Sequence, residues 1–277
     1  MRPSLVVISF TLLFLAFLLA PLNATAQSMP AQAPPPPQAT PSREDHWDAL
    51  LERHTRWATI DGVRLVAVDY SAVRVDPDWA VLMRQLRDAP EPAGRDDRVA
   101  FWLNAYNILA IDLVTRNYPV ESIRDIGGTL FNRVWSHDVA EVAGKVRSLG
   151  EVEHEILREV GGARVHAAIV CASVSCPPLR REAYRGGRLK EQLDDQIDLW
   201  LNNPKIGVQV SADGKTVTVS QIFDFFKGDF EKESGTVWGF IKPRIDAKLA
   251  ARVKVDSPRI RYLDYNWSLN DAARARK

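Results

Sequence analysis

Apolar residues occupy almost every side of the segment "DDRVAFWLNAYNILAIDLVTRNYP", residues 96–119. The segment has no helix breaker before its final proline, whose ring disfavours helix at Tyr118, so the pattern predicts one long, centrally buried helix. Asn104 and Asn107 lie three residues apart and therefore share a face of this helix. Because buried amides need hydrogen-bond partners, these asparagines either bond neighbouring backbone or orient a catalytic group or a substrate amide.

A second helix is predicted over "SLGEVEHEILREVGG", residues 148–162, with an S-x-x-E capping box at its start and two glycines at its end. Its apolar residues converge on one side at the helical repeat: Leu149, Val152, Ile156, Leu157 and Val160. Glu153 falls inside this apolar stripe, and His154 lies at its margin. A carboxylate directed into a core is either part of a structural ion pair or the group that holds a histidine in one tautomer.

The segment "ARVHAAIVCASVSCPPL", residues 163–179, contains both cysteines of the chain. Its first part is short and rich in β-branched residues, which predicts a buried strand over residues 163–173. Alternation places Cys171 on one face, at the end of this strand, and His166 on the other face. Cys176 follows in a loop that two prolines stiffen. His166 is either a core residue or part of a site.

The remaining segments are predicted to form structural elements of the domain and not its functional site. "LKEQLDDQIDLWL" (189–201) predicts an amphipathic helix, and "IGVQVSADGKTVTV" (206–219) predicts a hairpin. "SQIFDFFKGDF" (220–230) predicts a helix that begins at a Ser220 cap and carries core aromatics, and "RIRYLDYNWSLND" (259–271) predicts a closing strand. This order of elements favours the α+β class, as a helix-rich single domain packed around a small sheet.

The N-terminal region differs from the rest. An arginine precedes an unbroken apolar run over residues 5–20, and "NATAQS" offers a small-x-small cleavage site, so residues 1–26 are predicted to be a signal peptide. A membrane anchor is the alternative, although the run is shorter than a usual span. Residues 27–43 are proline-rich and predict an extended tether, which leaves residues 44–277 as one globular domain. The expected location is periplasmic or secreted, with no membrane span after cleavage.

Charge and cysteine content exclude several classes of protein. The formal net charge is +1 with no basic stripe, which argues against a nucleic-acid partner. Two cysteines among 277 residues are too few for a disulfide scaffold.

The blocks "AFWLNAYNILAIDLV", "YPVESIRDI", "SLGEVEHEILR", "RVHAAIVCASVSCPPLRREAY", "SQIFDFFKGDF" and "YLDYNWSLND" resemble the domain of unknown function family 547 in its secreted bacterial form, from about residue 45 to residue 271. The family has no established activity. The positions that the resemblance singles out are Asn104, Asn107, Glu153, His154, His166, Cys171 and Cys176. A Glu, His and Cys set is also similar to that of papain-like thiol hydrolases, so the fold could be papain-like.

Three interpretations of the cysteines compete. A disulfide suits an oxidising compartment, but five extended residues span about 16 Å, whereas bonded Cα atoms lie about 5.5 Å apart. A metal site could use both cysteines with His154 and His166, yet C-x4-C is not a recognised zinc spacing. A thiol enzyme is the third interpretation.

We favour the thiol enzyme, a hydrolase or acyl transferase acting on a peptide or amide. In this hypothesis Cys171 is the nucleophile, His154 the base and Glu153 its orienter, and Asn104 or backbone amides near Ser173 stabilise the oxyanion. The remaining family positions would contact substrate: Asn107, His166 and Cys176. No cofactor or metal is expected, and the partner would be a peptide or an envelope protein. The alternative is a non-catalytic periplasmic interaction or signalling module with a structural Cys/His/Glu core.

Overall fold

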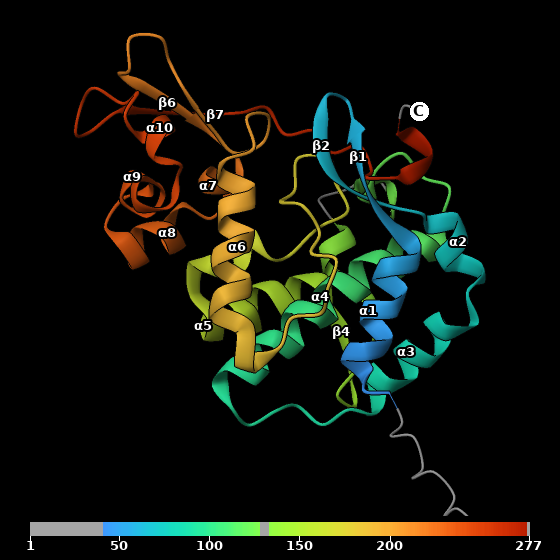
Figure 1. Cartoon of the computed structure of the whole chain (residues 1–277). Coiled ribbons are helices and arrows are strands. Elements are labelled where there is room, and N and C mark those ends of the chain that lie inside the picture. The colour runs from blue at the N-terminus through green and yellow to red at the C-terminus, as the bar shows by residue number, and fades with distance from the viewer. Residues whose placement is uncertain (1–40, 128–132, 276–277) are drawn as a thin grey trace, which may run out of the picture. The chain divides into compact units, whose positions relative to one another are not determined.

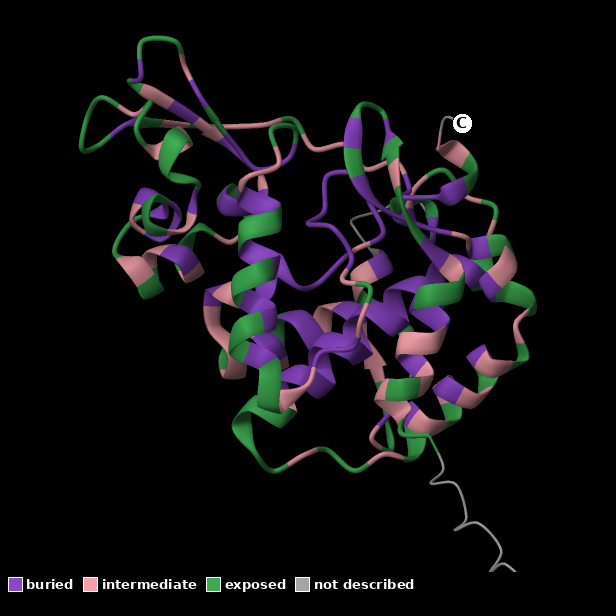
Figure 2. Cartoon of the chain, viewed as in Figure 1, coloured by how far each residue is buried: buried purple, intermediate pink, exposed green. Residues whose placement is uncertain are grey.

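Helix α4 (Arg95–Asn117) is the long central helix that the sequence predicts. Asp96 and Asp97 occupy its first turn, where their charges complement the positive end of the helix dipole. Every residue from Val99 to Thr115 is buried, and Figure 2 shows the helix almost entirely in the colour of buried residues. The helix ends at Asn117, and the backbone of the next residue, Tyr118, is extended ahead of Pro119. The prediction of a helix apolar on all sides, and therefore central, is confirmed.

The computed structural model describes residues 41–127 and 133–275. The described residues belong to one compact unit. The predicted signal peptide (1–26) and all but the last three residues of the predicted tether (27–43) lie outside the described residues. No helix in the described ranges is both long enough and apolar enough to cross a membrane.

The other α-helices of the described residues surround α4 or follow it in the chain (Figure 1). They are α1 (Arg43–His54), α2 (Tyr70–Val75), α3 (Pro77–Asp88), α5 (Arg158–Gly161), α6 (Leu189–Leu201), α7 (Ile222–Phe225), α8 (Lys227–Ser234), α9 (Val237–Ile241) and α10 (Ala247–Ala250). Helix α6 has the bounds that the sequence predicts.

The strands form separate small sheets rather than one. Their bounds are β1 (Thr55–Ile60), β2 (Val63–Val68), β3 (Asp138–Val142), β4 (Lys145–Ser148), β5 (Val208–Val210), β6 (Thr216–Val219) and β7 (Arg259–Tyr262). Strands β1 and β2 form an antiparallel hairpin, as do β3 and β4, while β6 pairs antiparallel with β5 and parallel with β7. The α+β class and the predicted hairpin are therefore confirmed, with several small sheets in place of one.

Two hydrophobic clusters make up the core. One is built around α4 with α1, α2 and α3, and the other around α6, α8, α9 and the sheet of β5 and β6. The segment that contains both cysteines, residues 163–179, contributes to both clusters. Val165 and Ala168 pack in the first cluster, whereas Ala167 and Val174 pack in the second. This segment is therefore held between the two halves of the core.

The strand predicted over residues 163–173 is not formed. The chain makes a short 3₁₀-helix at Gly162–Ala167 and then continues without regular structure. Asn107 of α4 explains the difference, because its side-chain amide donates to the Ala168 carbonyl at 3.0 Å and accepts from the Val170 N–H at 2.9 Å. One side chain thus satisfies the backbone groups that a neighbouring strand would otherwise pair.

The helix predicted over residues 220–230 is interrupted. Phe226 has φ −121° and ψ 29°, which separates α7 from α8. Phe223 and Phe230 are fully buried, as the sequence predicts, but Phe226 is only half-buried and faces a cavity. Of the closing strand predicted over residues 259–271, only β7 forms. After β7, Ser268 makes an isolated β-bridge to Ser122, and Leu269 makes one to Ser173.

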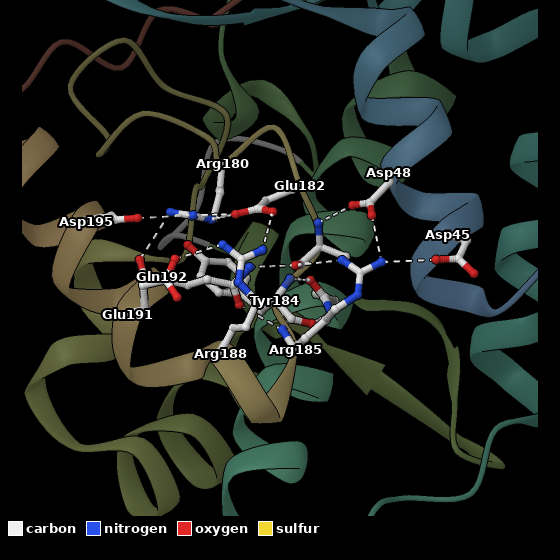
Figure 3. A network of polar contacts seen from close by, with 12 residues as sticks. Asp45, Asp48, Arg180, Glu182, Tyr184, Arg185, Arg188, Glu191, Gln192 and Asp195 are labelled. Carbon is white, nitrogen blue, oxygen red and sulfur yellow. Dashed lines mark hydrogen bonds and ion pairs between the residues drawn. The ribbon is translucent and has the colours of Figure 1, made fainter.

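A polar network fixes the chain that follows the cysteines. Figure 3 shows side chains from α1, from residues 180–188 and from α6 joined by hydrogen bonds and ion pairs. Arg185 donates to Asp48 at 2.7 Å, and Gln192 donates to the Ala183 carbonyl at 2.9 Å. Partly exposed ion pairs such as Arg185–Asp48 contribute little individually, but together with the hydrogen bonds they fix one path for the segment.

Candidate active site

The sulfur atoms of Cys171 and Cys176 lie 2.8 Å apart. The intervening loop doubles back, contrary to what the spacing of the two cysteines suggests. Cys176 N–H donates to the Ser173 carbonyl at 3.2 Å, Cys171 N–H donates to the Cys176 sulfur at 3.1 Å, and Ala172 adopts a positive φ of 62°. The two thiols are free, so the contact is a hydrogen bond between them.

The Cys176 sulfur is surrounded by hydrogen-bonding groups. Ser173 Oγ lies 3.1 Å and Tyr265 OH 3.3 Å from it, in addition to Cys171 N–H. Burial acts to raise the pKa of Cys176, but these hydrogen bonds and the one from Cys171 outweigh it and lower the pKa to about 6. The hydrogen bond to Cys176, together with burial, raises the pKa of Cys171. The two thiols therefore titrate as a pair, and the hydrogen bonds to Cys176 favour its sulfur as the site of the pair's first negative charge.

Both thiols line a cavity of about 520 Å³. Cys171 is partly exposed there, whereas Cys176 is only 3% exposed. The other lining residues are Tyr106, Arg124, Trp135, Glu153, His154, His166, Ile169, Gln221, Ile222, Phe225, Phe226, Tyr265 and Trp267. A ligand in this cavity would therefore meet Cys171 before Cys176.

Glu153 is buried beside the cavity, as its place in the apolar stripe predicts. It belongs to a π-helical stretch, Glu151–Leu157, and Arg158 N–H donates to its carbonyl five residues back. Tyr106 of α4 donates its hydroxyl to Glu153 Oε2 at 3.0 Å. Burial raises the pKa of Glu153 to about 7 although the Tyr106 hydrogen bond opposes this. The carboxyl is thus a proton donor or acceptor near neutral pH.

His166 is paired with an acid that the sequence does not reveal. Its Nε2 lies 2.8 Å from Oδ2 of Asp229 on α8, and its ring stacks on Phe226 at 4.0 Å. Arg158 donates to both oxygens of Asp229, at 2.6 and 2.8 Å. Burial lowers the pKa of His166 although Asp229 opposes it, so the ring is neutral at pH 7. Nδ1 of His166 is buried without a hydrogen-bond partner among the described residues.

His154 also reaches the cavity, but it is exposed and does not pair with Glu153. Its Nδ1 lies 3.3 Å from Arg158, and burial together with this cation lowers its pKa. Adjacent residues of a helix point in different directions, which is why Glu153 and His154 cannot form the predicted base and orienter. In the described ranges neither His154 nor His166 hydrogen-bonds a cysteine sulfur.

The two asparagines of α4 lie outside the cavity lining. Asn104 donates to the Tyr184 carbonyl and accepts from the Tyr184 N–H, both at 2.8 Å, so its amide binds the backbone of Tyr184 and not the cavity. We therefore withdraw the proposed oxyanion role of Asn104. Asn107 likewise holds backbone at residues 168–170, and it positions the chain that leads into Cys171. The amides of Val174, Ser175 and Cys176 are also occupied, which removes most of the backbone donors expected near Ser173.

Aromatic side chains form one wall of the cavity. Tyr265 and Trp267 lie 4.4 Å apart between ring centres, Phe225 packs against Tyr265 at 5.6 Å, and Trp135 packs against Trp267 at 5.7 Å. The Arg124 guanidinium lies 5.0 Å from the centre of the Trp267 ring. The sequence "DYNW" contains Tyr265 and Trp267, but its pattern is equally typical of a strand with no role in a site. Only the fold brings it beside the thiols.

A metal site receives no support from the described part of the chain, where no three His, Cys, Asp or Glu side chains are grouped to hold an ion.

The fold and cavity define an α+β domain with a pair of thiols in a pocket. Residues 90–201 match the family model described as "Protein of unknown function, DUF547", so the resemblance seen in the sequence is confirmed over this segment. The matched residues include α4, α6, Glu153, both cysteines and the two cavity histidines, His154 and His166. They do not include Asp229 or the aromatic residues Tyr265 and Trp267. No curated protein and no solved structure gives a significant match.

Proposed function

We propose that the protein is a thiol-dependent enzyme that hydrolyses or transfers an acyl group, with Cys171 as the nucleophile. The supporting observation is the 2.8 Å contact between the partly exposed Cys171 thiol and the Cys176 sulfur. A nucleophile needs a base within hydrogen-bond reach, and in this proposal the base is a second thiolate rather than an imidazole. This replaces the Cys171–His154 pair expected from the sequence.

In the first step the Cys176 thiolate accepts the Cys171 proton while the Cys171 sulfur attacks the substrate carbonyl carbon. The carbonyl electrons move to oxygen, and Tyr265, whose hydroxyl lies 3.5 Å from the Cys171 sulfur, is the proposed donor to this oxyanion. The bond to the leaving group then breaks, and Glu153 supplies the proton that the leaving group needs. Glu153 can carry that proton near neutral pH because burial raises its pKa to about 7.

In the second step a water molecule or another acceptor attacks the thioester. His154 is neutral and exposed at the cavity, so it is the proposed base for this attack. The Cys171 sulfur leaves and recovers its proton from Cys176, and the proton on His154 returns through solvent to Glu153. All protons are then restored to their starting positions.

The walls of the cavity favour an anionic substrate that offers an apolar or ring surface. Arg124 is the one permanently charged side chain among its described lining residues, and four aromatic rings stand beside it. A peptide with a free carboxylate satisfies both features, since guanidinium binds carboxylate and the rings bury apolar surface. A peptide of the cell envelope would fit the export that residues 1–26 predict.

A non-catalytic binding module is the second candidate. It is favoured by the aromatic wall and Arg124, which could hold a peptide whether or not the thiols react. In that case Cys171→Ala would retain peptide binding, and no acyl-enzyme would form.

The decisive test uses the reduced protein and p-nitrophenyl acetate, followed by intact mass and product release. We expect an initial burst, one acetyl group on Cys171 in a peptide map, and no acetylation in Cys171→Ser. Surface lysines provide an internal control for unspecific acetylation. Acetylation spread over lysines, with no preference for Cys171, would refute the proposal.

A further inference from the structure

The contact between the two sulfurs supports a second kind of chemistry, independent of acyl transfer. The hydrogen-bonded sulfurs are 2.8 Å apart, which is closer than the roughly 3.5–4.0 Å of carbon–carbon packing contacts and longer than the ~2.05 Å of a disulfide bond. We infer that Cys171 and Cys176 form a redox-active dithiol that reduces small-molecule or peptide disulfides by thiol–disulfide exchange.

The two sulfurs differ in the way that such exchange requires. Cys171 is partly exposed at the cavity, so an incoming disulfide can reach it. Cys176 is 3% exposed and lies behind it, where only Cys171 is within bonding reach. Cys171 is therefore the attacking thiol, and Cys176 is the resolving thiol.

The exchange balances in two displacements. The Cys171 sulfur, its proton taken by Cys176, attacks one sulfur of the substrate disulfide, forms a mixed disulfide and releases the first substrate thiolate. The Cys176 sulfur then attacks Cys171, forms the intramolecular disulfide and releases the second thiolate. The pair starts with one proton, which ends on one released thiol, and the other substrate sulfur leaves as a thiolate that takes its proton from solvent. The substrate disulfide therefore gains two electrons and the protein loses two.

The loop is held so that the disulfide closes with little movement. Asn107 fixes the chain before Cys171 at Ala168 and Val170. After Cys171, Val174 N–H donates to the Ser268 carbonyl at 2.8 Å. The sulfurs need to approach by only about 0.8 Å to bond.

The pair also differs from a purely structural disulfide. A structural bond is inaccessible to thiols, whereas the Cys171 sulfur borders a cavity of about 520 Å³ that admits a thiol the size of glutathione's reactive end. We therefore expect the bond to break and re-form in the native state.

The test equilibrates the native protein with buffers of reduced and oxidised glutathione, followed by acid quenching, alkylation and peptide mass. We expect both cysteines to pass from the thiol to the disulfide state together, in one transition within the range of glutathione ratios used. Cys176→Ser should accumulate a glutathione mixed disulfide on Cys171, and Cys171→Ser should not form one on Cys176. Circular dichroism and the thermal midpoint of each variant establish that it is folded.

A disulfide that stays closed at all glutathione ratios until the protein is denatured would contradict the inference, because the bond would be structural. Absence of a mixed disulfide in folded Cys176→Ser would contradict it as well. Neither result bears on acyl transfer, which is measured on the reduced protein by acetylation of Cys171. The two proposals can therefore fail separately.

Discussion

Nε2 of His166 lies 2.8 Å from Oδ2 of Asp229, and this contact joins the 3₁₀-helix ahead of the cysteines to α8. Arg158 donates to the same carboxylate, which connects the end of the π-helical stretch to the pair. Asp229 thus holds together the elements on one side of the cavity. Hydrogen bonds from His166 and Arg158 hold its pKa far below the usual range.

Replacing Asp229 by asparagine should destabilise the protein by about 1–3 kcal/mol, because a buried imidazole and a guanidinium lose a charged partner. The free energy of unfolding can be measured by urea titration. The folded-state pKa of Asp229 is depressed, so its contribution is present above the unfolded pKa of about 3.9 and is lost as the pH falls below it. The difference between variant and native protein should therefore shrink toward pH 3. A difference that does not change with pH would contradict a charged partnership.

Glu153→Gln should stabilise the protein at pH 8 and have little effect near pH 4.5. Burial raises the folded-state pKa of Glu153 to about 7, so the cost of ionising it appears as the pH rises above the unfolded pKa and is complete above the folded one. Gln keeps an oxygen that can accept from Tyr106 and removes the charge, which is worth about 2–3 kcal/mol at pH 8. Glu153→Ala lacks the acceptor and serves as the matched control, expected to be less stable at both pH values. Identical effects of Gln at both pH values would show that the carboxyl is solvated.

Arg124→Gln should weaken the binding of an anionic peptide ester without changing the stability of the fold. The side chain is exposed and its guanidinium stands over Trp267, so its loss removes a charge from the cavity and no core contact. We expect KM to rise roughly tenfold, about 1.4 kcal/mol, with kcat unchanged. Arg259→Gln, an exposed site on β7 outside the cavity lining, is the control. Equal changes in both variants would indicate a general charge effect.

The intact mass of the protein recovered from a periplasmic fraction should correspond to a chain that begins at Gln27. This follows from the apolar run at residues 5–20 and the small residues before the expected cleavage site. Full-length chain recovered in membranes would show that the run is an anchor.

The sequence predicts those features that depend on local pattern. The bounds of α4 and α6 follow from breakers and periodicity, and the burial of Glu153 follows from its position in an apolar stripe. What it could not predict depends on residues far apart in the chain. Asp229 lies 63 positions from His166, and no spacing connects them.

The strand predicted over residues 163–173 is wrong for a similar reason, because a residue distant in the chain decides the local structure. β-Branched residues before Cys171 favour a strand, but the amide of Asn107, brought there by the packing of α4, satisfies the backbone instead. The contact between the thiols also depends on tertiary structure, because the backbone carbonyls of residues 266 and 268 accept hydrogen bonds from the loop that joins Cys171 to Cys176. A pattern within the segment therefore could not reveal the pairing of Cys171 with Cys176.

The most direct test of the central claim, that Cys176 activates Cys171, is the alkylation rate of Cys171 in the reduced native protein as a function of pH. The claim predicts that the modification rate of Cys171 follows the first ionisation of the thiol pair, near pH 6, because transfer of the Cys171 proton to Cys176 then gives a reactive Cys171 thiolate. Cys176→Ser lacks this proton acceptor, so its rate should rise only toward an ordinary thiol pKa of about 8.5. His154→Ala should leave the rate unchanged, because His154 makes no hydrogen bond to either sulfur within the described residues. A Cys171 that remains unmodified in the reduced native protein, or one whose rate depends on His154 and not on Cys176, would contradict the claim.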